Sequence, residues 1–522
     1  MKSKDVLLIT GVGLLLGLCT SAYPLNAVDG PIFSCVGRAI RLGGAPYRQV
    51  WDIKGPAIFF FYALASGLGK EPFSVHALEA LWQCATALVL GCLAARIYSR
   101  RLAGVLAGIT YLLFFSFQYD AAFGQPDGLL SLPLALAVWF GLSAYEGGLL
   151  SDWMLAGALV GLAALFKTPA AILGIALLGM AVGGGSRSLP RVSRSLAGLA
   201  AGFLLPWLLC AAYFEYHGAL REFLWTIFVV GPKYSAFVWR HLDAGFTVRS
   251  LGEPPHIPLY FLMILGILSL RNLFPRRDHA SAGAYLAAAW ALSAMVMFVM
   301  QGGFFFYQFA PLYAPFALLG SATLERSIGQ IRGRRRAGVA VLALSATAAL
   351  AMLGSIVYFS SVSLELRREG RTPDRLRGLA DVLRARTAAG DSIYVWGRDA
   401  QVYLDAHRRP SSRFINATVV AGPWSELGLR EMFLQDLRTD PPAFFAVVRP
   451  SPQDPHELPE VRLRNFDADL ENFPALQQFL NENFSVDSKN DLWILYRRNA
   501  TPASPEGPFQ NQGAPASRLR EF

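Results

Sequence analysis

Three ionisable side chains, Asp29, Asp127 and Lys167, stand beside the ends of long apolar segments, and Lys54 lies in the loop after the first segment. Charged groups at such positions are costly and are functional candidates by default. A carboxylate can act as a general base on a hydroxyl, and ammonium groups can stabilise a departing phosphate. Transfer of a sugar from a lipid phosphate to a hydroxyl needs both kinds of group.

Further polar and aromatic residues lie in the same parts of the chain. Taken singly, Asp120 suits a helix cap, Lys54 suits an anchor at the membrane interface, and Tyr47 suits the interfacial aromatic belt. The convergence of carboxylates and lysines from separate parts of the chain on one predicted face favours a binding site. The residues that we expect to contact substrate there are Tyr47, Asp52, Asp120, Tyr307 and Gln308.

The elements that must position these residues are apolar and helical. The 522-residue chain is 53% hydrophobic and only 16% charged, whereas soluble domains carry about 25% charged residues. Apolar runs close to the ~20 residues needed to cross a bilayer recur up to residue 360. The sequence therefore predicts a polytopic α-helical membrane domain over 1–360, with about 11 transmembrane helices. The expected segments are 5–24, 75–97, 102–118, 127–146, 153–166, 169–184, 195–215, 257–272, 281–300, 304–322 and 337–360.

The distribution of arginines predicts which loops share a side of the membrane. If the N-terminus is inside, the arginine clusters fall in inner loops, as the positive-inside rule requires, and the inner loop near 147–152 is the exception. The short outer loops near 119–126 and 301–303 have no Lys or Arg. The long loops 25–74 and 216–256, and everything after 360, are then outside. We expect residues 5–24 to be an uncleaved first helix, the alternative being a cleavable signal peptide.

The polar C-terminal part predicts a soluble α/β domain over 361–498. A helix is expected from 374 to 389, with strands at 392–396, 443–448 and 492–496. Residues 499–522 are rich in Pro, Gly, Ser and Gln, a composition typical of disorder.

The charge and cysteine patterns narrow the functional classes. The net charge of +10 reflects loop arginines, and no basic patch with interleaved aromatics indicates nucleic-acid binding. The five cysteines form no CxxC pair, so neither a zinc site nor a disulfide framework is predicted. His241 and Asp243 are a weak pair of potential metal ligands. No cofactor is predicted, and a divalent cation remains an open alternative.

Several motifs resemble the GT-C glycosyltransferases, in the branch that includes protein O-mannosyltransferases and lipid A aminoarabinose transferases. The matching residues are Asp29, the Gly44-Ala45-Pro46-Tyr47 turn, Trp51-Asp52-Ile53-Lys54-Gly55-Pro56, Gln125-Pro126-Asp127, Phe166-Lys167-Thr168-Pro169 and Phe306-Tyr307-Gln308-Phe309-Ala310-Pro311. The chain departs from the pattern where Gly30 replaces a second acid and Gln308 replaces a histidine. The resemblance covers about residues 1–330.

The resemblance implies an inverting sugar transfer from a polyprenyl-phosphate donor, outside the cytoplasm of a bacterial inner membrane. In this hypothesis Asp29 is the base, and Lys54 and Lys167 hold the donor phosphate. Asp127 orients acceptor or sugar, or helps to hold a divalent cation. The acceptor, an envelope glycan, lipid or protein, is left open. The alternatives are a glycolipid transporter or flippase, and a non-catalytic membrane scaffold.

Overall fold

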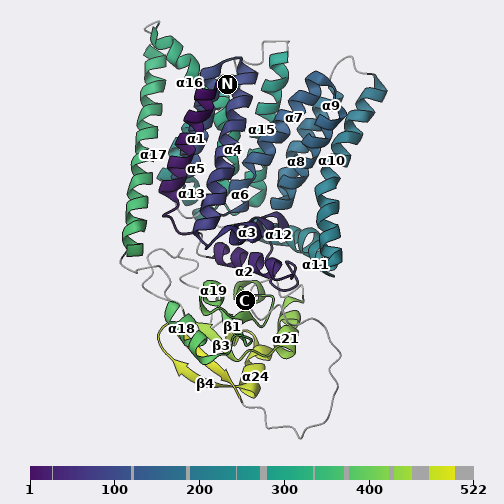
Figure 1. Cartoon of the computed structure of the whole chain (residues 1–522), viewed down its shortest axis with the longest axis vertical. Helices are drawn as coiled ribbons and strands as arrows, with labels where there is room; N and C mark the ends of the chain where they lie inside the picture. The colour runs from purple at the N-terminus through teal and green to yellow at the C-terminus, as the bar shows by residue number, and fades with distance from the viewer. Residues whose placement is uncertain are drawn as a thin grey trace.

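A helical bundle stands on a smaller mixed α/β domain, and several short helices lie between the two (Figure 1). The structure, a computed structural model, describes residues 1–25, 28–118, 123–183, 188–242, 244–270, 279–332, 336–368, 376–421, 428–449 and 470–499. The chain is a polytopic helical membrane protein with a C-terminal mixed-sheet domain.

Long apolar helices form the bundle. Among the described residues, six helices are long and apolar enough to cross a membrane. They are α1 (Ser3–Thr20), α4 (Phe73–Tyr98), the run Pro126–Gly147 made of α6 (Pro126–Leu129) and α7 (Ser131–Gly147), α10 (Leu189–Tyr216), the Ala282–Gln301 part of α15 (His279–Gln301), and the Arg336–Leu366 part of α17 (Arg336–Arg368). The pair α13 (Ala244–Gly252) and Pro254–Leu270, bent by 54°, adds a seventh if it is one span.

The prediction of about 11 spanning helices is therefore confirmed only in part. Apolar helices do occur at the remaining positions, but three of them have 17 residues or fewer, at or below the short end of the range that crosses a bilayer. These are α5 (Arg101–Phe117), α8 (Leu150–Phe166) and the run Thr168–Val182, made of the 3₁₀-helix η1 (Thr168–Ala171) and α9 (Ile172–Val182). The late segment forms α16 (Ala310–Arg332), which contains Pro315 and ends in a charged turn.

The two long regions expected as loops are largely helical. The first holds α2 (Asp29–Arg41) and α3 (Pro56–Leu68). The second holds α11 (Leu220–Trp225), the π-helix η2 (Thr226–Val230), α12 (Gly231–Arg240) and α13, followed by η3 (Pro254–His256) and α14 (Ile257–Leu270). In Figure 1, α2, α3, α11 and α12 lie at the end of the bundle that faces the C-terminal domain.

The C-terminal domain is built around a five-stranded sheet in the order β2-β1-β3-β5-β4. Its central strands β1 (Ser392–Trp396) and β3 (Phe444–Val448) are parallel and fully buried, and β3 pairs antiparallel with β5 (Trp493–Arg498). These three strands agree with the predicted ones. The edge strands β2 (Arg409–Pro410) and β4 (Phe484–Lys489) were not predicted, since one is very short and the other polar. The helices in the described part of this domain are α18 (Arg377–Arg386), α19 (Gln401–Ala406), α20 (Ala417–Ala421), α21 (Leu429–Thr439) and α24 (Pro474–Asn483).

Two arginines just after α4 lie at one end of the bundle. The N-terminus lies at the end remote from the C-terminal domain (Figure 1). At that remote end, Arg101 pairs with Asp5 near the start of α1, and Arg100 pairs with Glu325. Arg100 and Arg101, which the sequence assigned to an inner loop, thus lie at the same end of the bundle as the N-terminus.

Candidate active site

Asp29 and Lys54 form an ion pair at the end of the bundle near the C-terminal domain. Asp29 is the first residue of α2, where a carboxylate suits the positive end of the helix dipole. Lys54 precedes α3, which begins at Pro56. The Nζ atom of Lys54 lies 3.3 Å from Oδ2 of Asp29, and both side chains keep about a fifth of their surface exposed, 20% and 19%. The pair is therefore partly accessible.

Tyr47 fixes the backbone that leads to Lys54. Its hydroxyl donates a hydrogen bond to the Lys54 carbonyl oxygen over 2.8 Å. Its side chain is fully buried and packs against the rings of Phe59, Phe214 and Phe223. The sequence predicted Tyr47 as a substrate contact, whereas this geometry suits a residue that positions Lys54.

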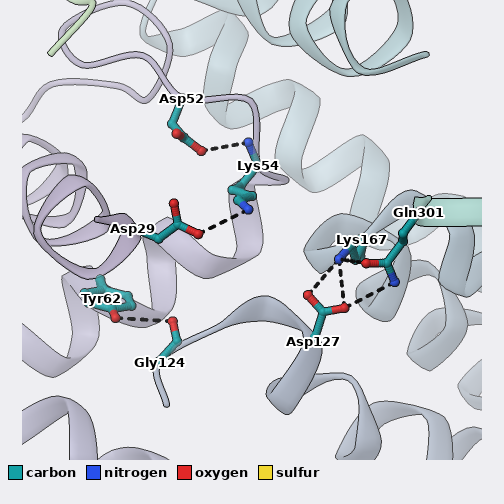
Figure 2. A network of polar contacts seen from close by, with 8 residues as sticks. All are labelled: Asp29, Asp52, Lys54, Tyr62, Gly124, Asp127, Lys167 and Gln301. Atoms are coloured by element: carbon teal, nitrogen blue, oxygen red, sulfur yellow. Dashed lines mark hydrogen bonds and ion pairs between the residues drawn. The ribbon is translucent and has the colours of Figure 1, made fainter. Parts of the chain in front are cut away.

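Asp127 and Lys167 form a second, more buried ion pair. The Nζ atom of Lys167 donates to both carboxylate oxygens of Asp127 over 2.7 Å. Gln301, the last residue of α15, completes the group: its side-chain oxygen accepts from Lys167 over 2.5 Å, and its nitrogen donates to Asp127 over 3.3 Å. The Asp127 side chain is only 1% exposed. Figure 2 shows the three side chains converging from separate elements.

The two ion pairs meet at one aromatic ring. Lys54 Nζ lies 5.4 Å and Lys167 Nζ 5.7 Å from the centroid of the Tyr307 ring. Both distances are within the range of cation–π attraction. Tyr307 belongs to the short 3₁₀-helix η4 (Phe306–Phe309). The predicted residues Asp29, Lys54, Asp127, Lys167 and Tyr307 therefore belong to one site.

Gly55 permits this meeting. A Cβ atom at Gly55 would lie only 2.2 Å from the carbonyl oxygen of Leu165 and 2.8 Å from that of Phe166. The backbone at Gly55 therefore lies directly against the C-terminal end of α8. Lys167, the residue that follows α8, has extended dihedral angles. Pro169, in the first turn of η1, lacks the backbone N–H that would continue α8 by bonding to the Leu165 carbonyl. The helix break and the missing Cβ together place the two lysines near each other.

The segment 124–128, which carries Asp127, is held by polar side chains of α3 and α4. Glu79 accepts a hydrogen bond from the Gly124 amide over 2.9 Å. Tyr62 donates to the Gly124 carbonyl over 3.2 Å (Figure 2). Gln83 donates to the Gly128 carbonyl over 3.1 Å. These bonds fix the turn before α6, where Gly124 has a positive φ of 70°.

Asp52 is the third carboxylate of the region. Its side chain accepts a hydrogen bond from the Lys54 amide over 2.9 Å, so it shapes the same turn. Burial raises the pKa of Asp52 to about 6, and the nearby charge of Asp29 adds to that rise. Burial opposes the charge of Lys54, but Asp29 and Asp52 hold the pKa of this lysine well above its usual value. Lys54 is therefore a permanent cation.

The remaining predicted residues have other surroundings. The Gln308 side-chain oxygen accepts from the Phe305 amide over 3.1 Å and so caps η4. Asp120 lies outside the described residues, as does Asp243, which was paired with His241 as a metal candidate. Within the described ranges no group of three or more His, Cys, Asp and Glu side chains is arranged to hold a metal ion.

Comparison with known proteins now adds a family. Residues 53–212 match the dolichyl-phosphate-mannose-protein mannosyltransferase family. The matched segment begins just before Lys54 and contains Asp127 and Lys167, whereas Asp29 lies before its start. This confirms the resemblance to GT-C glycosyltransferases that the sequence motifs indicated. No curated protein sequence matches the chain.

Solved structures of GT-C enzymes share the fold. ArnT from Cupriavidus metallidurans bound to undecaprenyl phosphate matches with a TM-score of 0.60 and 14% identity, over 97% of this chain and 100% of that one. Its apo state gives 0.56 and 14%, over 96% and 99%. The Archaeoglobus fulgidus oligosaccharyltransferase in complex with zinc and sulfate gives 0.50 and 12%, over 85% and 68%. At these identities the matches establish the fold.

Sequence reasoning missed two polar residues of this region. Glu79 lies in α4, a predominantly apolar span, and is 1% exposed. An acidic residue inside a spanning helix is itself a signal that could have identified it. Gln301 is uncharged and stands at a helix end, and only the folded chain brings it to Asp127.

Proposed function

We propose that this chain is a membrane glycosyltransferase that moves a sugar from a polyprenyl-phosphate donor to an acceptor hydroxyl or similar nucleophile outside the cytoplasm. The observation that carries the proposal is the meeting of two lysine–aspartate pairs at the Tyr307 ring. ArnT, which shares the fold, has been crystallised with undecaprenyl phosphate. A lipid phosphate as the ligand of the two lysines accounts for both facts.

The proposed reaction uses the accessible carboxylate as base. Asp29 takes the proton of the acceptor while the acceptor oxygen forms a bond to the anomeric carbon of the donor. The bond between that carbon and the phosphate oxygen breaks, and its electron pair leaves with the polyprenyl phosphate. Attack from the face opposite the phosphate inverts the anomeric configuration. Lys54 and Lys167 stabilise the charge that accumulates on the leaving phosphate.

Exposure distinguishes the roles of the two aspartates. Asp29 retains 19% of its side-chain surface, whereas Asp127 retains 1% and uses both oxygens on Lys167 and Gln301. A base must reach the proton that it removes. We therefore assign the base to Asp29 and give Asp127 the task of aiming Lys167. Asp52 and Tyr47 would fix the turn that presents Lys54.

The sidedness of the membrane follows from the arginines. Loop arginines gather at the end of the bundle with the N-terminus, and the candidate site lies at the other end (Figure 1). Under the positive-inside rule this arrangement supports a site and a C-terminal domain outside the cytoplasm. The membrane that we propose is a bacterial inner membrane.

The test is transfer by the purified full chain in lipid nanodiscs. Cells with the gene, without it, and with Asp29→Asn are first compared by mass spectrometry of envelope glycans and polyprenyl-phosphate sugars. The sugar that the deletion loses from its acceptor identifies the donor for the purified enzyme. Asp29→Asn keeps the shape of the side chain but removes the base, so we expect kcat to fall by about 10²–10⁴-fold.

Three outcomes decide between this proposal and its alternatives. Accumulation of the lipid donor in both mutants, with an inverted product from the wild-type enzyme, supports the transferase. A product that keeps the donor configuration contradicts direct displacement. An Asp29→Asn strain that behaves as wild type, beside a deletion strain with altered glycans, favours a transporter or a scaffold instead.

A further inference from the structure

The segment that carries Lys54 is bonded to the C-terminal domain at Trp51. The Trp51 amide donates a hydrogen bond to the carbonyl oxygen of Arg413 over 2.7 Å. The Trp51 ring packs against Phe414 with 5.6 Å between centroids. On its other side, the indole nitrogen donates to the Thr226 hydroxyl of the helical bundle over 3.0 Å. Trp51 therefore joins the two domains, three residues before Lys54.

The surface that receives Trp51 is firmly held within the C-terminal domain. Asp436 of α21 accepts hydrogen bonds from the Arg413 amide over 3.1 Å and from its guanidinium group over 3.1 and 3.0 Å. The Phe414 carbonyl accepts from the Tyr394 hydroxyl of β1 over 2.7 Å, and the Phe414 side chain is 1% exposed. The turn at Arg413 and Phe414 is thus a fixed point for the membrane domain.

The lysine segment itself needs such a point. Between α2 and α3 the chain forms no regular helix or strand, only an isolated β-bridge between Pro46 and Val50, and it contains Gly43 with a positive φ of 88°. A catalytic group displaced by about 1 Å can cost about 10²-fold in rate. The irregular segment that carries Lys54 therefore has to be held by contacts with other parts of the protein. A second contact acts in the same sense, because α19 packs on α2, the helix that begins at Asp29.

We propose that the C-terminal domain is part of the transfer site, and that Phe414 and the Arg413 turn are positioning residues for Lys54. This inference rests on the proposed function. The domain would keep Trp51 in place, and Trp51 would in turn keep the Lys54 ammonium group within reach of the donor phosphate. The C-terminal domain then contributes to lipid-phosphate affinity without contacting the lipid phosphate.

The test is the affinity of the full chain in nanodiscs for undecaprenyl phosphate itself. Lys54→Met should weaken binding about tenfold, the value of one charge-assisted hydrogen bond. Phe414→Leu keeps apolar volume but loses the ring contact, and Asp436→Asn loosens the Arg413 turn; each should weaken binding by about threefold or more. Asp487→Asn is the matched control, because Asp487 of β4 forms a comparable ion pair with Arg386 of α18, away from this junction.

Coupling to Lys54 separates positioning from a general structural role. If Phe414 acts through Lys54, adding Phe414→Leu to Lys54→Met should weaken binding no further than Lys54→Met does by itself. Full additivity of the two changes overturns the inference, and so does wild-type affinity in both Phe414→Leu and Asp436→Asn. A wild-type chain that does not bind undecaprenyl phosphate at all contradicts the proposed function instead.

Discussion

Lys167 donates to both carboxylate oxygens of Asp127, over 2.7 Å each, from a break between two helices to the first turn of another. A carboxylate with 1% of its side chain exposed would be costly without a cation. The pair is therefore a structural requirement as well as part of the candidate site. The two lysines of the site therefore differ in their partners. Lys167 pairs with the buried Asp127, whereas Lys54 pairs with the partly exposed Asp29.

Removal of the Lys167 charge should destabilise the fold. We expect Lys167→Met to lower the free energy of unfolding by about 3–5 kcal/mol, because Asp127 would remain buried and unpaired. Adding Asp127→Asn should restore part of the loss. Unfolding in detergent measures both. Arg384→Met, which breaks an exposed pair with Asp381, is the control and should cost less than about 1 kcal/mol. Equal losses of unfolding free energy in Lys167→Met and Arg384→Met would contradict this account.

A methyl group at Gly55 should separate the two lysines. The Cβ of Gly55→Ala would meet the Leu165 carbonyl oxygen at 2.2 Å, and backbone atoms cannot rotate away as a side chain does. We expect transfer to fall by about 10²-fold, since the Lys54 segment must move by about an ångström. Gly67→Ala in α3 is the control, because its Cβ would meet only the end of Arg41 at 3.8 Å. Full activity in Gly55→Ala would show that the close approach is dispensable.

The raised pKa of Asp52 predicts a specific pH dependence of stability. Burial raises this pKa from 3.8 to about 6, so the folded state holds a proton that the unfolded state releases. The contribution of Asp52 is fully present below about pH 4 and is lost as the pH rises to about 6, by at most about 3 kcal/mol. Melting temperatures between these pH values should fall more steeply for the wild type than for Asp52→Asn. Parallel curves would rule out the shift.

The Tyr307 ring should matter more than its hydroxyl. Both lysine ammonium groups lie within 6 Å of the ring centroid, at 5.4 and 5.7 Å. Tyr307→Phe keeps the ring and should leave affinity for undecaprenyl phosphate within about threefold of wild type. Tyr307→Leu removes the attraction and should weaken binding by about tenfold, given about 0.5–2 kcal/mol for each cation. A larger loss in Tyr307→Phe than in Tyr307→Leu would assign the function to the hydroxyl.

The sequence was sufficient to select most of the site because charge is conspicuous in an apolar chain. Asp29, Lys54, Asp127 and Lys167 stand beside apolar runs, and the structure brings all four to one ring. Short, mostly apolar runs predicted the central strands near 392 and 443, whose residues are buried throughout. Sequence reasoning failed for the edge strand β4 (Phe484–Lys489), because the strand is mostly polar and has only one buried residue.

Roles within the site could not be read from residue types. Tyr47 and Gln308 are polar residues in a candidate region, yet their hydrogen bonds go to the backbone of Lys54 and Phe305. Asp29 and Asp127 are the same residue beside similar segments, and only burial distinguishes them, at 19% and 1% exposed. Local sequence does not record which neighbours will cover a side chain.

The sequence by itself determined which part of the chain lies in lipid and which lies in water, since long apolar runs require a bilayer and the polar C-terminal part does not. It also determined the chemical groups, because Asp and Lys near membrane segments are too costly to keep without a use or a partner. Tertiary structure alone decided the pairing. Lys167 meets Gln301 across 134 positions, and Trp51 meets Arg413 and Phe414 in another domain. Such contacts depend on how whole helices pack, and packing is a property of all their side chains together.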